Sequence, residues 1–372
     1  ALARGAPPAF RLTSDLRGLR MSIPAINWSK GATAGGAFEI AGRLGAVPEI
    51  DAMSLDAPGL EARGTLSLRE GGGLDRATFS RARVGGWLDG PVTLVGRGTG
   101  RPPEIRIGGG TFDLRRAELG GGSGGAGGPM RIALDRLRVT DGISLTGFQG
   151  DFTTSGGFQG EFVASVNGNA PVQGVVAPTA GGTAVRIRSN DAGAVLRAAN
   201  LFETAGSGSF DMSLTPTGRQ GQFDGVLDID NLRIRDAPAL ASLIDAISVV
   251  GLLQQLDGQG LLFTEVDADF RISPGQIAIL QSSAVGPGLG ISLDGYYTPA
   301  DRRMDFQGVL SPLYLINGVG SVLTRPGEGL FGFAYRLTGP VGEHKVEVNP
   351  LSVLTPGMFR EIFRRPAPEA TQ

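Results

Sequence analysis

Apolar and polar residues alternate along residues 222–234 and 262–272, in the two-residue period of a β-strand that buries one face. The apolar positions of the first stretch include Phe223, Leu227 and Ile229. Those of the second stretch include Leu262, Val266 and Phe270. Acidic side chains fill most of the alternate positions. We therefore predict two strands of a sheet that has one apolar face and one solvated face.

The same alternation recurs in shorter pieces from residue 10 to residue 348, and Gly, Pro or Asp bounds each piece. A spacing of roughly 8–12 residues between such pieces is typical of a chain of antiparallel hairpins. The later pieces add further residues to the predicted apolar face: Met304, Phe306, Phe331, Phe333 and Tyr335. These patterns predict a mainly β protein built on a long, curved antiparallel sheet.

Four segments interrupt this pattern with helical spacing, at about residues 191–203, 237–256, 312–323 and 350–365. Asp191 is a suitable N-cap for the first of them. The apolar residues of the second segment include Leu243, Ile244, Ile247, Leu252 and Leu253. The last segment combines an apolar side with a basic side: Met358, Phe359, Ile362, Phe363, Arg364 and Arg365.

These apolar helices have two interpretations. In the first, they cover an open end or an edge of the sheet, as amphipathic helices of globular proteins commonly do. In the second, they contact a membrane, and the arginines of the last helix lie near anionic headgroups. The sequence leaves both interpretations open.

One low-complexity tract, GGGSGGAGG at residues 120–128, indicates a flexible loop. It separates an N-terminal β segment, residues 1–119, from a C-terminal β segment, residues 129–372, which carries the four helical insertions. We expect this tract to be the main boundary within the chain.

Composition excludes several functions. The formal net charge of −2 provides no basic excess for binding nucleic acid. The absence of cysteine excludes disulfides, thiolate metal sites and cysteine catalysis. No apolar run reaches the roughly 18–20 residues that a membrane helix needs. Because the chain begins ALARGAPPAF, without Met or a signal-like segment, we expect a fragment or a processed product.

No catalytic constellation stands out. The only histidine, His344, lies in a sequence typical of a turn. Two pairs of aspartates two residues apart share a strand face and could hold a cation or act as acid and base: Asp228 with Asp230, and Asp267 with Asp269. Charges on the solvated side of a half-buried strand are routine, and the alternation already accounts for these pairs. We expect no enzyme, no cofactor and no metal.

Several long segments resemble the C-terminal region of the AsmA-like family, specifically its YhdP branch. They include DIDNLRIRDAPALASLIDAISVVGLLQQLDGQGLLFTEVDADFRI and SAVGPGLGISLDGYYTPADRRMDFQGVLSPLYLING. Others are GEGLFGFAYRLTGPVGEHKVEVNPLSVLTPGMFREIF and, upstream, NDAGAVLRAANLFETAGSGSFDM. The N-terminal DLRGLRMSIPAINWSK is similar to a recurrent segment of the same family. The likeness covers most of the chain; it is strong from about residue 191 to the end and weaker before it.

This resemblance implies a bridge-like protein of the Gram-negative cell envelope that serves outer-membrane biogenesis. Such a protein is anchored in the inner membrane by an N-terminal segment, which this chain does not contain, and extends through the periplasm. Its partners would be phospholipids and the inner and outer membranes. Phospholipids would pass along the apolar side of a curved β-sheet.

Physical chemistry agrees with this expectation. A phospholipid in transit exposes two acyl chains at about 0.8 kcal/mol per CH₂, so it needs a continuous apolar path. A sheet with alternating faces forms an open apolar groove if it curls without closing, and transport along it requires no catalytic residue. The alternative is a structural or interaction module in which the apolar faces meet in a closed core. A hydrolase acting through the aspartate pairs is a third, weaker interpretation.

Overall fold

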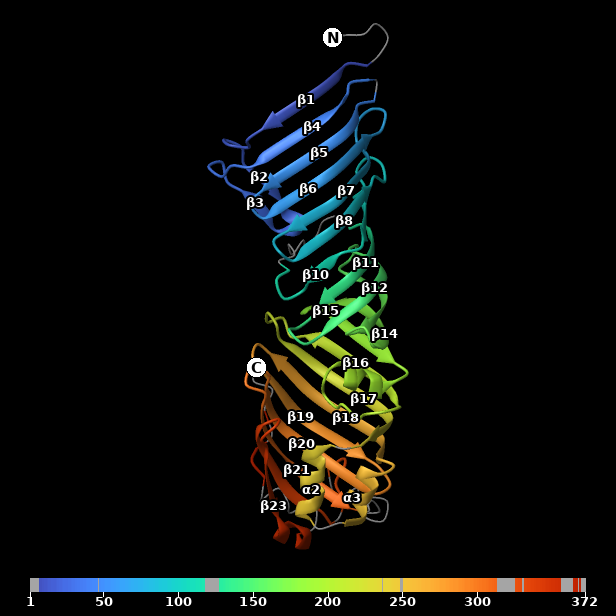
Figure 1. The fold of residues 1–372 in the computed structure, drawn as a ribbon, viewed down its shortest axis with the longest axis vertical. Helices are drawn as coiled ribbons and strands as arrows, with labels where there is room; N and C mark the ends of the chain where they lie inside the picture. Colours follow the sequence, from blue (N-terminus) through green and yellow to red (C-terminus); the bar gives the residue numbers. More distant parts are fainter. Residues whose placement is uncertain are drawn as a thin grey trace. The chain divides into compact units, whose positions relative to one another are not determined.

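The computed structural model describes residues 7–45, 47–117, 127–235, 237–247, 250–312, 325–329, 331–355, 364–366 and 368. Within these residues, 21 strands belong to one sheet, and β2 (Met21–Ile23) and β3 (Trp28–Lys30) form a separate hairpin. The few helices are short (Figure 1). The prediction of a mainly β fold with a large curved sheet is confirmed.

The chain divides into two compact units. The first comprises Ala1–Gly168 and Val175–Pro178, and the second comprises Asn169–Gly174 and Thr179–Gln372. Strand β14 (Ala170–Thr179) contributes residues to both. The other sheet strands of the first unit are β1 (Ala9–Ser14), β4 (Ala37–Arg43), β5 (Glu49–Ala57), β6 (Leu60–Leu68), β7 (Leu74–Val84), β8 (Leu88–Val95), β9 (Glu104–Gly108), β10 (Thr111–Asp113), β11 (Pro129–Arg138), β12 (Ser144–Thr153) and β13 (Gln159–Val166).

The described residues of the second unit form nine further strands in the order of the chain: β15 (Gly182–Ser189), β16 (Ser209–Pro216), β17 (Phe223–Ile234), β18 (Leu261–Ser273), β19 (Gln276–Val285), β20 (Leu289–Thr298), β21 (Arg303–Pro312), β22 (Phe333–Pro340) and β23 (Lys345–Asn349). Each of these strands pairs antiparallel with the next. The two strands predicted from the clearest alternation are β17 and β18.

The glycine tract interrupts an otherwise antiparallel order. Strands β9 and β10, which precede the tract, both pair parallel to β11, which follows it. The tract therefore joins strands of one unit, whereas the division between the compact units lies near β14. Residues 118–126 themselves lie outside the described residues.

Two of the four expected helical segments are described in full or nearly so. Helix α1 (Ala192–Ala198) begins where predicted, and the Asp191 carboxylate accepts a hydrogen bond of 2.8 Å from the Ala194 N–H. The second segment consists of two helices, α2 (Pro238–Ala246) and α3 (Val250–Asp257). Residues 313–324 and 356–363 lie outside the described residues, and a 3₁₀ helix, η3 (Pro350–Leu354), begins the last segment.

Cross-strand ion pairs line the polar face of each unit. In the first unit, Arg131 on β11 lies 3.1 Å from Asp151, its direct partner on β12. In the second unit, Arg271 on β18 lies 2.6 Å from Asp224, its direct partner on β17. Pairs of opposite charge placed directly across two strands stabilise the pairing modestly. Because direct partners share a face, the residues that alternate with these charged positions along each strand point to the other side.

Candidate functional site: the apolar face of the second unit

One face of the second unit carries apolar side chains on every strand from β15 to β23. The strand register places these side chains in rows that cross the sheet. One row runs through Phe223, Ile272, Ile277, Tyr297 and Met304. A second row runs through Ile229, Val266, Ala284, Ile291, Leu310 and Phe333. We call this surface the apolar face of the second unit.

Ten of the eleven residues predicted to line a groove lie in these strands: Phe223, Leu227, Ile229, Leu262, Val266, Phe270, Met304, Phe306, Phe333 and Tyr335. The register puts nine of them on the apolar face; Leu262 is treated below. The eleventh, Phe331, precedes β22 and is 58% exposed.

The apolar face is half-buried over much of its area. Phe223, Leu227, Val266, Phe270 and Met304 are all intermediate in exposure. A second layer packed on a sheet buries such side chains almost completely, as in a β-sandwich. Their residual exposure fits an uncovered apolar surface better than a closed core.

Glycine lets an aromatic ring lie flat on this face. The ring of Phe270 crosses over Gly225, its direct partner on β17. A Cβ added at Gly225 would come within 2.2 Å of that ring. The close approach therefore depends on the missing side chain, and it shapes the middle of the apolar face.

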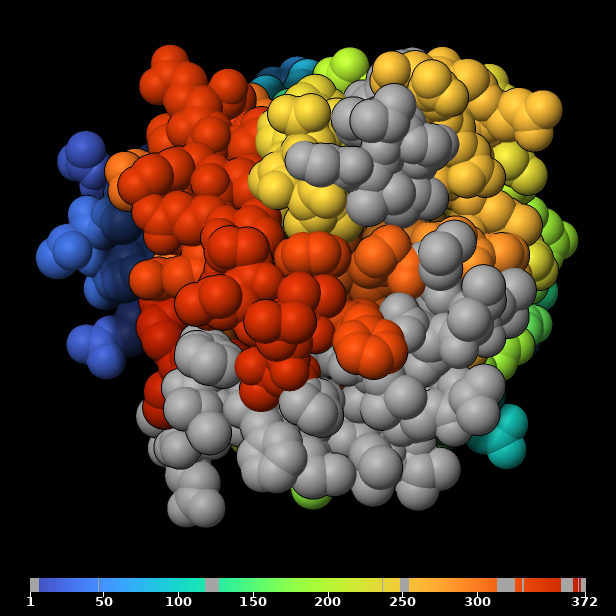
Figure 2. All heavy atoms as spheres, turned by 90° about the horizontal axis from the view of Figure 1, so that it is seen from below, coloured from blue at the N-terminus to red at the C-terminus, as the bar shows by residue number. Residues whose placement is uncertain are grey.

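Helices α2 and α3 close one end of the apolar face. Helix α2 packs against α3 and β23, while α3 packs against β18, so the pair bridges strands that lie far apart in the sheet. Figures 1 and 2 show α2 and α3 at this end, with α2 beside the β23 region. Ile244 and Leu256 are fully buried, and so are Leu289 and Leu310 at the ends of β20 and β21. This burial favours the interpretation of α2 and α3 as a plug.

The alternation breaks where β17 and β18 approach these helices. Asn231 adopts a left-handed backbone with φ of 56°, and beyond it Leu261 and Phe263 are each 2% exposed. Leu262, which the sequence pattern assigns to the apolar face, is only half-buried between them. The pattern therefore missed Phe263, one of the largest fully buried side chains.

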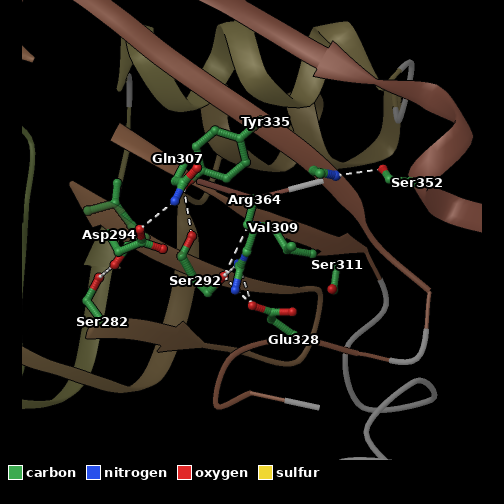
Figure 3. A network of polar contacts seen from close by, with 12 residues as sticks. Ser282, Ser292, Asp294, Gln307, Val309, Ser311, Glu328, Tyr335, Ser352 and Arg364 are labelled. Carbon is green, nitrogen blue, oxygen red and sulfur yellow. Dashed lines mark hydrogen bonds and ion pairs between the residues drawn. The ribbon is translucent and has the colours of Figure 1, made fainter. Parts of the chain in front are cut away.

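A buried polar network covers the opposite face of β20 and β21 (Figure 3). The Arg364 guanidinium lies 2.6 Å from a Glu328 carboxylate oxygen, and their side chains are 5% and 3% exposed. Ser292 on β20 donates to the same carboxylate at 2.9 Å and accepts from Arg364 at 3.0 Å. Hydrogen bonds from a neighbouring hydroxyl to both charged groups offset part of the cost of burying an ion pair.

The next residue in the chain, Arg365, also binds to the sheet. The Gln307 side chain accepts from the Arg365 N–H at 3.1 Å and donates to the Arg365 carbonyl at 2.8 Å. Arg365 also forms a bidentate ion pair with Asp305, at 2.9 and 2.8 Å, which lowers the pKa of that carboxyl. Ion pairs and hydrogen bonds therefore fix residues 364 and 365 to β20 and β21.

These contacts bear on the two interpretations of the last helical segment. Arg364 is enclosed against Glu328 and Arg365 is paired with Asp305, as expected of a segment that covers the sheet, and membrane contact by the rest of the segment stays a prediction. The sequence analysis did not identify Glu328, because its partner Arg364 lies 36 residues further along the chain. Periodicity also gives no sign that residues 364 and 365 lie on the polar face of the sheet.

The predicted helix residues fall into two groups. Leu243 and Ile244 are buried, at 5% and 0% exposure, and Ile247 is half-buried. The positions of the remaining apolar side chains lie outside the described residues: Leu252, Leu253, Met358, Phe359, Ile362 and Phe363.

The aspartate pairs lie together on the polar face. Asp228 faces Asp267 directly across β17 and β18, and Asp230 faces Glu265. Burial and then the neighbouring carboxylates raise the pKa of Asp267. Among the described residues, no group of three or more such side chains is arranged to hold a metal ion. His344 contacts α2, with its Nε2 3.3 Å from the Ser242 hydroxyl.

No helix in the described part of the chain has the length and hydrophobicity needed to cross a membrane. Comparisons of the chain with protein-family models, with curated proteins and with solved structures returned no match.

Proposed function

We propose that the second unit carries phospholipids, with their acyl chains on its apolar face, between the inner and outer membranes of a Gram-negative envelope. The protein would act in the periplasm and be tethered to the inner membrane through a segment outside this chain. No catalytic step is involved, since moving a lipid along a surface breaks no bond.

The observation that carries this proposal is the half-exposed part of the apolar face, which includes Phe223, Leu227, Val266, Phe270 and Met304. Apolar area left in water costs about 25 cal/mol per Å², so a large uncovered face calls for an apolar occupant. An acyl chain fits this requirement because it needs a continuous apolar path and no hydrogen-bonding partner. The rival function, a structural module with a closed core, finds support at the α2–α3 end and in the burial of Phe306, Tyr335 and Leu337 on β21 and β22.

Site-specific photo-crosslinking in cells tests the proposal. A photoreactive residue at Phe270 on the apolar face is expected to capture phospholipid, and the same residue at Val226 is its matched control. Val226 is an exposed apolar residue on the adjacent strand, and its direct partner Asp269 shows that it lies on the polar face. Capture at Phe270 but not at Val226 supports lipid carriage, whereas capture at neither position contradicts it.

A further inference from the structure

The connection between β1 and β4 in the first unit carries an exposed apolar loop. It contains the β2–β3 hairpin and the short 3₁₀ helix η1 (Pro24–Ile26), which project at one edge of the sheet (Figure 1). We call residues 17–25 the edge loop. Leu19 and Ile23 are 50% and 39% exposed there, and Pro24 and Ala25 are exposed beside them.

The edge loop is also basic. Arg17 and Arg20 are both exposed, and residues 17–25 contain no acidic side chain. Neither guanidinium forms an ion pair within the described part of the chain, in contrast to arginines such as Arg131 and Arg271 on the polar face of the sheet. The loop therefore combines apolar side chains with two positive charges that are free for an external partner.

A rigid support holds the loop in this conformation. The Lys30 ammonium is buried and donates to three backbone carbonyls: those of Leu16 at 2.6 Å, Gly31 at 3.1 Å and Leu19 at 3.2 Å. Trp28 is also buried, and its indole N–H donates to the Pro58 carbonyl at 2.9 Å. All three ammonium donors are thus used to fold the backbone of the loop around Lys30. The exposed leucine and isoleucine are consequently held outward instead of collapsing onto the sheet.

We propose that the edge loop docks the first unit onto an anionic phospholipid bilayer. Leu19 and Ile23 would enter the boundary between headgroups and acyl chains, while Arg17 and Arg20 would contact the phosphates. This combination of apolar and basic side chains is what interfacial membrane binding requires. A protein partner fits less well, because a stable protein interface uses about 20–30 residues a side and the edge loop offers fewer than ten.

This inference is independent of the apolar face of the second unit. Lipid carriage concerns acyl chains held along β15–β23, whereas the edge loop concerns adsorption of the first unit to a membrane surface. The two proposals therefore succeed or fail separately.

Co-sedimentation of the whole chain with vesicles tests the inference. One set of vesicles contains phosphatidylcholine alone, and the other contains phosphatidylcholine with phosphatidylglycerol. Two double variants remove the proposed contacts: Leu19→Asp with Ile23→Asp, and Arg17→Glu with Arg20→Glu. All four positions are exposed, and circular dichroism verifies that each variant folds.

Two matched controls separate the loop from general surface effects. Leu44→Asp introduces the same kind of change at a residue that is also 50% exposed, at the other end of β4. Arg97→Glu with Arg101→Glu makes the same change in net charge in the exposed turn between β8 and β9.

The wild-type chain is expected to sediment with the phosphatidylglycerol vesicles and much less with phosphatidylcholine alone. Loss of each arginine should weaken binding roughly fivefold. Both edge-loop variants should therefore lose most of the binding, and both controls should keep it. The inference is overturned if the wild type does not bind the anionic vesicles, or if the edge-loop variants bind them as well as the controls do.

Discussion

At the scale of single residues, the polar face of β17 and β18 contains an unfavourable arrangement. Asp228 and Asp267 face each other directly, with Asp230 and Glu265 as the next opposed pair. Like charges placed directly opposite each other destabilise strand pairing. The Asp267 carboxylate accepts a long hydrogen bond of 3.4 Å from the Ser283 hydroxyl, and no ion pair neutralises it within the described residues. Its raised pKa reflects burial first and these carboxylates second.

Asp267→Asn is therefore expected to stabilise the protein at neutral pH by up to about 1 kcal/mol. A carboxyl whose pKa is raised by folding contributes stability below its unfolded pKa and loses that contribution as pH rises through its folded pKa. The advantage of the variant should accordingly shrink as the pH falls into the mildly acidic range. Urea unfolding of both proteins at neutral and acidic pH measures the difference; an advantage that grows on acidification would refute this account.

Residue-level prediction from the sequence succeeded where alternation is regular. The assignment of Phe223, Leu227, Val266 and Phe270 to one face agrees with the register of β17 and β18. The assignment missed Phe263, whose direct partner Leu232 is buried just beyond the left-handed Asn231 on β17, because an isolated Asn does not indicate that conformation.

At the scale of elements, α2 and α3 resemble each other in length and apolar content but depend on different partners. Helix α2 contacts β23, and α3 contacts β18, so their docking links an interior strand of the second unit to its last strand. The sequence predicted the helical segment, and its spacing of apolar residues indicated a buried side. The sequence did not decide whether these helices plug the end of the apolar face or contact a membrane. That depends on which strands lie next to them in the folded sheet.

Ile244→Ala tests the importance of α2 docking. Ile244 is fully buried, so the truncation should lower the free energy of unfolding by about 2–5 kcal/mol through lost burial and the cavity left behind. Hydrogen exchange should also quicken in α2 and β23. Asp245→Ala, at an exposed position of the same helix, is the control and should change stability by less than about 0.5 kcal/mol. A loss equal to that of the control would mean that α2 does not hold this end together.

At the scale of the whole molecule, each compact unit presents one apolar and one charged face. In the first unit, the register aligns Ile40 with Met53 on the apolar face, and Phe79 with Val92. Fold class was predictable because two-residue alternation is a local signal that repeats along the chain. The parallel pairing of β9 and β10 with β11, and the division of units near β14, were not predictable because pairing between distant segments leaves no periodic trace.

The central claim is that the apolar face of the second unit holds phospholipid. The most direct measurement is the amount of phospholipid that copurifies with the protein, determined by lipid extraction and mass spectrometry. The wild type is compared with Val266→Asp combined with Phe270→Asp, and with Val226→Lys as the control, which places a charge opposite Asp269 on the polar face.

We predict bound phospholipid in the wild type and in the control, and a loss of at least roughly tenfold in the double variant, because a carboxylate against an acyl chain is strongly unfavourable. Equal amounts of phospholipid in all three proteins, or none in the wild type, would contradict the account.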